Sequence, residues 1–417
     1  MIRGCAPLFV LLLSMLSGCS STLDSLGQDQ NSNGGSTSVG NALRPLTPLS
    51  PYNAFKELGI ATEDESKAKL RAAFSSLFDP DPDPDSVKNI LVPQPTGALI
   101  KDVLHHDDVR TEGMGLGMVI AVALDRKDVF DQLWSYTQAN LAIDSGAAQG
   151  YFNSLCDEDL VTTCLDTYGM QQFALALVLA NGRWPSASYS HDALAILDQL
   201  QHGIGDPFDA KTHLVREEPK LVPPEYTRSA LEMPGAYWLW AQATGDSFWT
   251  EAATAARQHL VSAANTTTGL WPLRSDFSGN PVTGDFTEQA YRTELNLALD
   301  ALWGKGGASK ADADNQEKLA DLLLAFFKAQ GLKTYGATFT VAGDPIDSTH
   351  AQALVSVNGA LVVAASRTDV NKDDRIAFAN FLWTQEIPTG KNRYYDGLLY
   401  MMSMLIMSGQ LQVVQAH

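Results

Sequence analysis

The chain has 417 residues, of which 45% are hydrophobic, and its formal net charge is -19. This length and composition allow one large domain with a sizeable buried core. They exclude nucleic acid as a partner, because so strong a negative charge repels phosphates. The charge carries no information about uncharged partners.

The N-terminus has the pattern of an export signal. A basic start is followed by an apolar run over residues 8–16, which is too short to span a bilayer as a mature helix. Residues 16–19, Leu-Ser-Gly-Cys, resemble a bacterial lipobox, in which Cys19 becomes the lipidated first residue after cleavage. The alternative is an ordinary secretory signal with a chance cysteine. We therefore expect a lipoprotein signal peptide over residues 1–18 and a lipid anchor in the cell envelope; Ser20 favours the outer membrane.

A polar segment follows the expected anchor. Residues 20–50 are rich in Ser, Gly, Asn and Gln and have few aromatic residues. Such a segment buries too little apolar surface to order itself. We expect residues 19–51 to form a flexible tether. The folded domain is expected over residues 52–417.

Two cysteines remain beyond Cys19, namely Cys156 and Cys164. In an oxidising compartment so short a loop can close as a disulfide, which would stabilise the fold by about 2–4 kcal/mol in the loop-closure model. The alternatives are two free thiols or half of a metal site. Metal is the weakest of the three, because no His or further Cys lies nearby in the sequence.

Apolar residues recur with helical spacing through most of the remaining chain. Val129, Phe130, Leu133 and Trp134, for example, fall on one face of a helix. The same periodicity predicts further helices near residues 64–77, 112–125, 170–181, 190–202, 229–243, 247–264, 288–303, 314–330, 350–366, 373–383 and 394–409. Alternation typical of strands is scarce. Many helices of even length, separated by short loops, predict an all-α toroid of helical hairpins.

A set of motifs in consistent order over roughly residues 52–410 carries a resemblance to a known family. It includes Tyr52-Asn-Ala-Phe-Lys-Glu-Leu-Gly59, Asp108-Val-Arg-Thr-Glu-Gly-Met-Gly-Leu-Gly-Met118, Ala290-Tyr-Arg292 and Arg393-Tyr-Tyr-Asp-Gly-Leu-Leu-Tyr400. This set resembles the family 8 glycoside hydrolases, most closely their exo-acting branch that cuts oligoxylan. The resemblance implies an (α/α)6 barrel and inverting hydrolysis of β-linked polysaccharides.

Inversion requires two carboxyl groups. One protonates the leaving oxygen, and a carboxylate roughly 6.5–9.5 Å away activates water on the opposite face of the sugar. The resemblance implies Glu112 as the general acid, followed by glycines that would leave room beside a ligand. The alternative is an ordinary acid in a first helical turn, favoured by the helix dipole.

The expected partners of this acid are replaced. The resemblance implies an Asp base immediately before Ala-Tyr-Arg, where this chain has Gln289, and a further Asp at the position of Tyr168. Residues 228–234 also depart from the acidic and aromatic pattern that the resemblance implies for sugar contacts. An amide cannot accept a proton from water at neutral pH. The candidate substitute bases are three nearby acids, each of which has a solvated loop acid as its alternative reading: Glu288, Asp285 and Asp166.

Aromatic and charged residues near these motifs are candidates for binding sugar, because flat rings stack on the apolar faces of pyranoses. The resemblance places the following residues in the cleft: Tyr151, Trp271, Tyr291, Arg292, Tyr394, Tyr395 and Asp396. The alternative for Arg292 and Asp396 is a structural ion pair. Other tryptophans lie in strongly apolar stretches and are expected in the core: Trp134, Trp238, Trp240, Trp303 and Trp383.

The sequence contains no phosphate-binding loop, no histidine pair with metal spacing and no nucleophile elbow, so we expect no cofactor and no metal. Two functions compete most closely. One is hydrolysis of a β-1,4-linked polysaccharide or oligosaccharide by a monomer, with Glu112 as acid. The other is an inactive surface lipoprotein that binds polysaccharide or matrix components. A helical scaffold with a closed cleft is a third, weaker hypothesis.

Overall fold

The computed structural model describes residues 42–49, 52–80, 88–105, 107–154, 165–220 and 224–415. They belong to one compact unit, residues 39–417. The expected signal peptide, Cys19 and the Cys156–Cys164 pair lie outside the described ranges, so those calls stay predictions. None of the described helices combines the length and the hydropathy needed to cross a bilayer.

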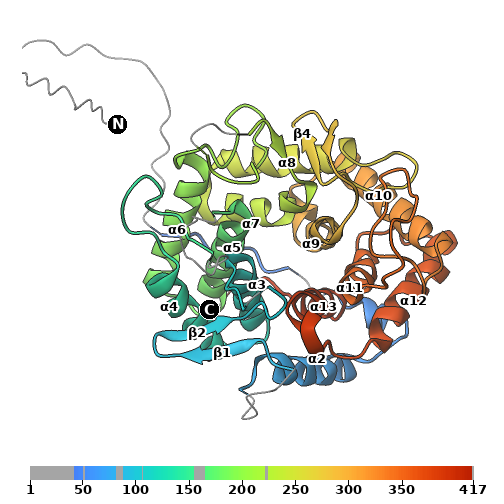
Figure 1. The fold of residues 1–417 in the computed structure, drawn as a ribbon, viewed down its shortest axis with the longest axis horizontal. Coiled ribbons are helices and arrows are strands. Elements are labelled where there is room, and N and C mark those ends of the chain that lie inside the picture. Colours follow the sequence, from blue (N-terminus) through green and yellow to red (C-terminus); the bar gives the residue numbers. More distant parts are fainter. Residues whose placement is uncertain are drawn as a thin grey trace, which may run out of the picture. The chain divides into compact units, whose positions relative to one another are not determined.

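Six helical hairpins form a closed double ring in this unit (Figure 1). The inner helices are α3 (Thr111–Ala123), α5 (Thr167–Arg183), α7 (Pro234–Thr244), α9 (Arg292–Trp303), α11 (Gln352–Leu361) and α13 (Arg393–Met407). The outer helices are α2 (Glu63–Phe78), α4 (Lys127–Asn140), α6 (Ala187–His202), α8 (Ser247–Ser262), α10 (Lys310–Ala329) and α12 (Asp369–Thr384). Each inner helix packs on the next, and α13 packs against α3 and closes the ring. The predicted (α/α)6 barrel is confirmed.

The sequence explains which helices are inside. After Glu112, helix α3 has no charged residue, and it is buried on nearly all sides. Helix α4 is instead amphipathic and buries the predicted face, including Val129 and Leu133, while its other face is polar. Outer helix α2 begins with a capping box between Thr62 and Glu65, which satisfies backbone donors at its exposed end.

Two inner helices begin later than the periodicity predicts. The stretch expected at 229–243 starts with a 3₁₀ turn, η1 (Ser229–Leu231), and α7 starts only at Pro234, whose fixed φ and missing N–H suit a first helical turn. The stretch expected at 288–303 likewise opens with η2 (Glu288–Ala290), and α9 follows from Arg292. Both 3₁₀ turns therefore lie at the same end of the ring as the candidate site.

Short strands join the helices. Strands β1 (Leu91–Gln94) and β2 (Gly97–Ile100) form an antiparallel hairpin. Strands β3 (Tyr226–Thr227), β4 (Arg274–Asp276) and β5 (Pro281–Thr283) form a small antiparallel sheet, in which Thr227 pairs with Ser275. The second sheet fixes the chain immediately before Arg228 and at Arg274.

The folded unit begins before Tyr52, so the tether expected over residues 19–51 is too long at its C-terminal end. The backbone N–H of Leu43 donates to Ser190 Oγ, and that of Arg44 donates to the carbonyl of Ala243, each at 2.7 Å. Leu46 is buried. These backbone bonds and apolar side chains attach the segment to the barrel.

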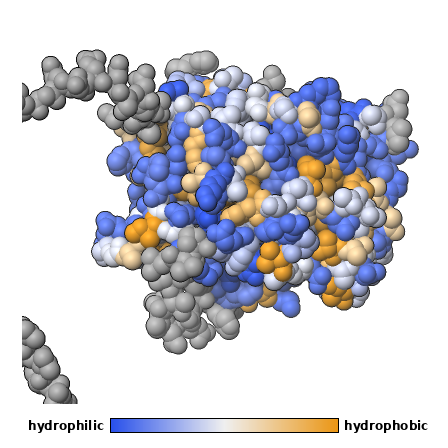
Figure 2. Space-filling view, turned by 90° about the horizontal axis from the view of Figure 1, so that it is seen from above, coloured by the Kyte–Doolittle hydropathy of each residue, from blue (hydrophilic) through white to orange (hydrophobic). Residues whose placement is uncertain are grey.

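The tryptophans follow the core prediction in most cases. Trp134, Trp240 and Trp303 are buried, and Trp238 and Trp383 are partly buried against the core. On the face seen in Figure 2, hydrophilic residues cover most of the described surface and hydrophobic residues form separate patches. The apolar side chains are thus largely buried inside the ring.

Candidate active site

A pocket of about 650 Å³ opens at the end of the ring where the inner helices begin. Residues from the first turns of α3, α5, α9, α11 and α13 line it, together with the segment before α7. Helix N-termini carry partial positive charge, so carboxylates are favoured there. The pocket is lined by eight acidic residues: Asp102, Glu112, Asp166, Glu217, Glu218, Glu288, Asp347 and Asp396.

Glu112 lies in the first turn of α3 and forms an ion pair with Arg292 through Nη1 and Oε1. The Arg292 side chain is only 7% exposed. Burial alone would lower the pKa of Arg292, but the charge of Glu112 outweighs it and raises this pKa. The ion pair that was the alternative reading for Arg292 therefore exists, and its partner is the candidate acid.

The glycines after Glu112 do not leave space for a ligand, contrary to expectation. A Cβ at Gly113 would lie 2.4 Å from Tyr394 Oη, and one at Gly115 would lie 2.4 Å from Gln172 Cβ. They allow α3 to approach its neighbours α13 and α5 closely. Their role is packing of the inner ring around the site.

Tyr168 occupies the wall where the resemblance implies an acid. The guanidinium carbon of Arg292 lies 4.4 Å from the centre of its ring, a cation–π contact. The hydroxyl is buried and has no hydrogen-bond partner among the described residues. Arg292 thus has two contacts in the pocket wall, the ring of Tyr168 and the carboxylate of Glu112.

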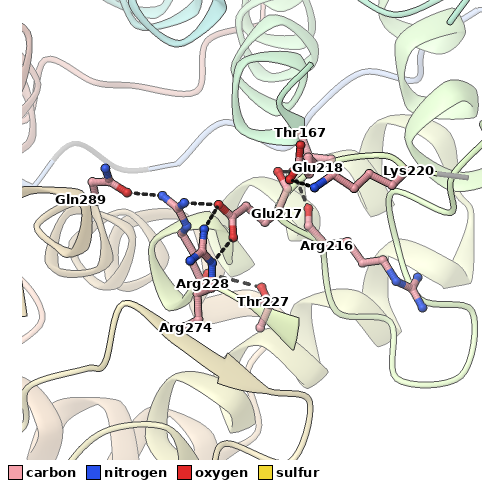
Figure 3. Close-up of polar contacts among 9 residues, drawn as sticks. All are labelled: Thr167, Arg216, Glu217, Glu218, Lys220, Thr227, Arg228, Arg274 and Gln289. Atoms are coloured by element: carbon pink, nitrogen blue, oxygen red, sulfur yellow. Dashed lines mark hydrogen bonds and ion pairs between the residues drawn. The ribbon is translucent and has the colours of Figure 1, made fainter. Parts of the chain in front are cut away.

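Gln289 is bonded to an arginine instead of being free to face a water molecule. Its Oε1 accepts a hydrogen bond from Nη1 of Arg228, and Nη2 of Arg228 pairs with Glu217 (Figure 3). Arg274 binds the same carboxylate through a two-bond fork, with Nε 2.5 Å from Oε2 and Nη2 2.8 Å from Oε1. Burial would raise the pKa of Glu217, but these arginines outweigh it and lower the pKa.

The three candidate substitute bases lie in different surroundings. Asp166 caps α5: Thr111 Oγ1 and the backbone N–H of Gly169 donate to its carboxylate, the latter at 2.7 Å, and burial raises its pKa. Glu288 is exposed and lines the pocket, and no hydrogen bond to its carboxylate is seen in the described part of the chain. Asp285 does not line the pocket, so the structure gives no support to its expected role as base.

Five of the seven expected binding residues line the pocket: Tyr291, Arg292, Tyr394, Tyr395 and Asp396. The Tyr291 and Tyr395 ring centres are 6.5 Å apart, and Tyr395 Oη donates to the Glu288 carbonyl at 2.5 Å. Asp396 accepts the N–H of Ala353 at 3.0 Å, and burial raises its pKa to about 6. It thereby caps α11 and forms no ion pair with Arg292.

The other two expected binding residues belong to the core. Trp271 is fully buried, and its indole N–H donates to the carbonyl of Leu260 at 2.8 Å. Tyr151 is 2% exposed, and its hydroxyl donates to the carbonyl of Ile204 at 2.6 Å. Neither lines the pocket, so the expectation for both is wrong.

Sequence reasoning missed Glu217 and the role of Arg228. Glu217 lies in a loop that Thr167 holds, since Thr167 Oγ1 donates to the carbonyls of Arg216 and Glu217 at 2.6 and 3.1 Å. No motif surrounds Glu217 that could have identified it. Within the described ranges no group of three or more His, Cys, Asp or Glu residues is placed to hold a metal ion.

Comparison with known proteins identifies the class of this ring and pocket. The family described as glycosyl hydrolases family 8 matches residues 95–409. The chain belongs to this family, and glycoside hydrolysis is the general activity that its relatives support.

Among the relatives, the reducing end xylose-releasing exo-oligoxylanase of Halalkalibacterium halodurans is 31% identical over 87% of this chain and 94% of its own length. Endoglucanase A of Acetivibrio thermocellus is 25% identical over 71% of this chain and 60% of its own length. The structure of Rex8A from Paenibacillus barcinonensis complexed with xylose aligns with a TM-score of 0.78 at 29% identity. The alignment covers 88% of this chain and 98% of the Rex8A chain.

Proposed function

We propose that the protein is an inverting glycosidase that acts on short β-1,4-linked oligosaccharides, with xylo-oligosaccharides as the first candidates. The observation that carries this proposal is the position of Glu112 in the pocket at the start of α3. Three relatives that cover most of this chain are named reducing-end xylose-releasing exo-oligoxylanases. A pocket of about 650 Å³ has the size of a site for a short ligand.

In this proposal Glu112 protonates the leaving oxygen. A general acid must carry a proton, whereas the ion pair with Arg292 uses the carboxylate. The substrate therefore has to displace Arg292 from Glu112 before the acid can act. Arg292 keeps the face of Tyr168 as a second contact during this exchange.

We assign the base to Glu288, the residue before Gln289 in η2. An inverting base must be ionised and reach water, and Glu288 is exposed at the pocket. Asp166 is held by Thr111 and Gly169, and Glu217 is held by two arginines. Glu288 is thus the candidate whose carboxylate is least engaged.

The test is release of reducing sugar from xylotetraose, cellotetraose and chitosan tetramer by the wild-type chain. Glu288→Gln is expected to lower the rate by about 10²–10⁴-fold. Asp285→Asn is the matched control, because Asp285 lies nearby and outside the pocket, and it should retain the wild-type rate. Equal rates for Glu288→Gln and the wild type would remove Glu288 from the proposal.

A second candidate function is binding without cleavage, as a surface protein for polysaccharide or matrix components. The bond between Gln289 and Arg228 and the place of Tyr168 beneath Arg292 favour it. Under this function the wild type binds oligosaccharides but releases no sugar from them. Calorimetry measures binding and chromatography measures cleavage in the same sample, and together they distinguish the two candidate functions.

We also propose that the protein is monomeric and that Cys19 carries a lipid anchor in the outer membrane. The lipobox-like residues 16–19 support the anchor. Metabolic labelling with a radioactive fatty acid, followed by membrane separation, tests it. Cys19→Ser should abolish the label and release the protein from the outer-membrane fraction.

A further inference from the structure

A cluster of three charged side chains at the edge of the pocket has one unbalanced positive charge. Arg228 and Arg274 both pair with the single carboxylate of Glu217, and Gln289, the fourth member, is neutral (Figure 3). Arg228, Glu217 and Gln289 line the pocket. Neighbouring Glu218 is paired with Lys220, so it does not supply the missing charge.

The scaffold holds this cluster in place. Arg228 follows β3 and Arg274 begins β4, and the two strands pair through Thr227 and Ser275. The guanidinium of Arg274 also lies 5.4 Å from the ring centre of Tyr226. The two arginines are therefore presented from one rigid sheet.

Arg228 has binding capacity left. Its bonds to Gln289 and Glu217 use one N–H on each terminal nitrogen, and its Nε is buried with no hydrogen-bond partner in the described structure. The side chain is 16% exposed. Glu217 already has a two-bond fork from Arg274, so it stays neutralised when Arg228 turns toward a ligand.

We propose that Arg228 is a specificity residue that binds the carboxylate of a uronic acid unit in a β-1,4-linked oligosaccharide. One added carboxylate gives two arginines and two carboxylates, which balances the cluster. Arginine binds carboxylates in a planar, two-bond geometry, and Gln289 offers an amide N–H₂ beside it. The acidic residues that line the rest of the pocket oppose an anion, so the affinity has to come from direct contact between Arg228 and the ligand carboxylate. Repulsion by charges more than about 10 Å away is screened at 0.1 M salt.

This inference rests on the proposed oligosaccharide pocket, not on hydrolysis. Its test uses three β-1,4-linked tetrasaccharides that differ only at C5 of each ring. Xylotetraose carries hydrogen there, cellotetraose carries CH₂OH, and the tetramer of β-1,4-glucuronate carries a carboxylate. Calorimetry on the wild-type full chain gives each Kd, and chromatography of the same samples records cleavage.

The glucuronate tetramer is expected to bind about 10-fold or more tightly than cellotetraose. Arg228→Gln should abolish this preference, so that the glucuronate tetramer binds no more tightly than cellotetraose. Arg274→Gln leaves Arg228 as the one arginine that pairs with Glu217, so Arg228 is less available to a ligand. The preference should therefore fall, although Arg274 is outside the pocket. Glu217→Gln removes the competing carboxylate and should strengthen the preference.

Lys310→Gln is the matched charge control, because Lys310 is 87% exposed on α10, and it should leave the preference unchanged. Thermal unfolding checks that each variant is folded, and Arg228→Lys supplies a charge-conserving variant with partial preference. Equal Kd values for the glucuronate and gluco tetramers overturn the inference, as does a preference that survives Arg228→Gln. If the protein cleaves neutral tetramers but does not prefer the glucuronate tetramer, the proposed hydrolysis holds and this inference fails. If it prefers the glucuronate tetramer but cleaves none of the three, this inference holds and the proposed hydrolysis fails.

Discussion

The guanidinium of Arg292 pairs with the carboxylate of Glu112 and lies 4.4 Å from the ring centre of Tyr168, so the candidate general acid is held in an ion pair. An acid at position 168 would give Arg292 a second anionic partner and would compete with Glu112 for the guanidinium. With a tyrosine at this position, Glu112 is the carboxylate that pairs with Arg292 among the described residues. The residue at position 168 thus bears directly on whether Glu112 can take up a proton.

Tyr168 is expected to act through its ring and not through its hydroxyl. Tyr168→Phe removes a buried hydroxyl without a described partner, so the free energy of unfolding should rise or stay within about 1 kcal/mol. Tyr168→Leu removes the cation–π contact with Arg292 and should lower it by about 1–3 kcal/mol. Urea unfolding measures both. A loss for Phe as large as that for Leu would show that the hydroxyl is bonded.

Restoring a carboxylate at position 289 should raise the rate of hydrolysis. Gln289→Asp places a base where an amide now binds Arg228, and the expected gain in kcat is at least about 10-fold. Gln289→Asn, which has the same shape without the charge, is the control. A rate for Asp equal to that for Asn would mean that a missing base is not what limits turnover.

The buried carboxyl of Glu232 should make stability depend on pH. Burial raises its pKa to about 8, although Thr227 and Val215 donate hydrogen bonds to it. The native state holds this proton where the unfolded state, with a pKa near 4.5, has lost it. Stability from this group is therefore present at low pH and is lost as pH rises from about 4.5 toward 8.

Glu232→Gln cannot ionise and should escape this loss. The difference in unfolding free energy between variant and wild type should grow in favour of the variant from pH 5 to pH 8, by an amount on the order of a few kcal/mol. Urea unfolding at several pH values measures it. A difference that does not change with pH would contradict the assignment.

Glu294 is a second buried acid, and both of its carboxyl oxygens lack hydrogen-bond partners among the described residues. Burial raises its pKa well above the ordinary value. Glu294→Met, of similar volume, should raise the free energy of unfolding by about 1–3 kcal/mol at neutral pH. Glu317→Met, on the exposed face of α10, is the control and should change it by less than about 0.5 kcal/mol. A destabilised Glu294→Met variant would indicate an undetected partner.

Local patterns predicted the ring well. The face of α4 with Val129 and Leu133 is set by neighbouring residues, and it is buried as predicted. Which aromatic side chain faces the pocket depends on packing against residues that are distant in the sequence. Trp271 and Tyr151 are bonded to Leu260 and Ile204 in the core. The sequence alone could not distinguish them from Tyr395, which lines the pocket.

The charged cluster was beyond prediction for the same reason. Glu217, Arg228, Arg274 and Gln289 lie on four segments, and the pairing of β3 with β4 brings the two arginines together. Strands of two or three residues carry almost no periodic signal in a helical chain. The sequence drew attention to Gln289 at the position expected for the base, but not to the arginine that binds its amide.

Glu112 is proposed to act as the acid of an inverting hydrolysis. Proton NMR of xylotetraose during incubation with the full chain tests this role most directly. The wild type should release product whose new reducing end appears first as the α-anomer, and Glu112→Gln should be slower by about 10²–10⁴-fold. No cleavage by the wild type, or cleavage that Glu112→Gln leaves unchanged, would contradict the claim.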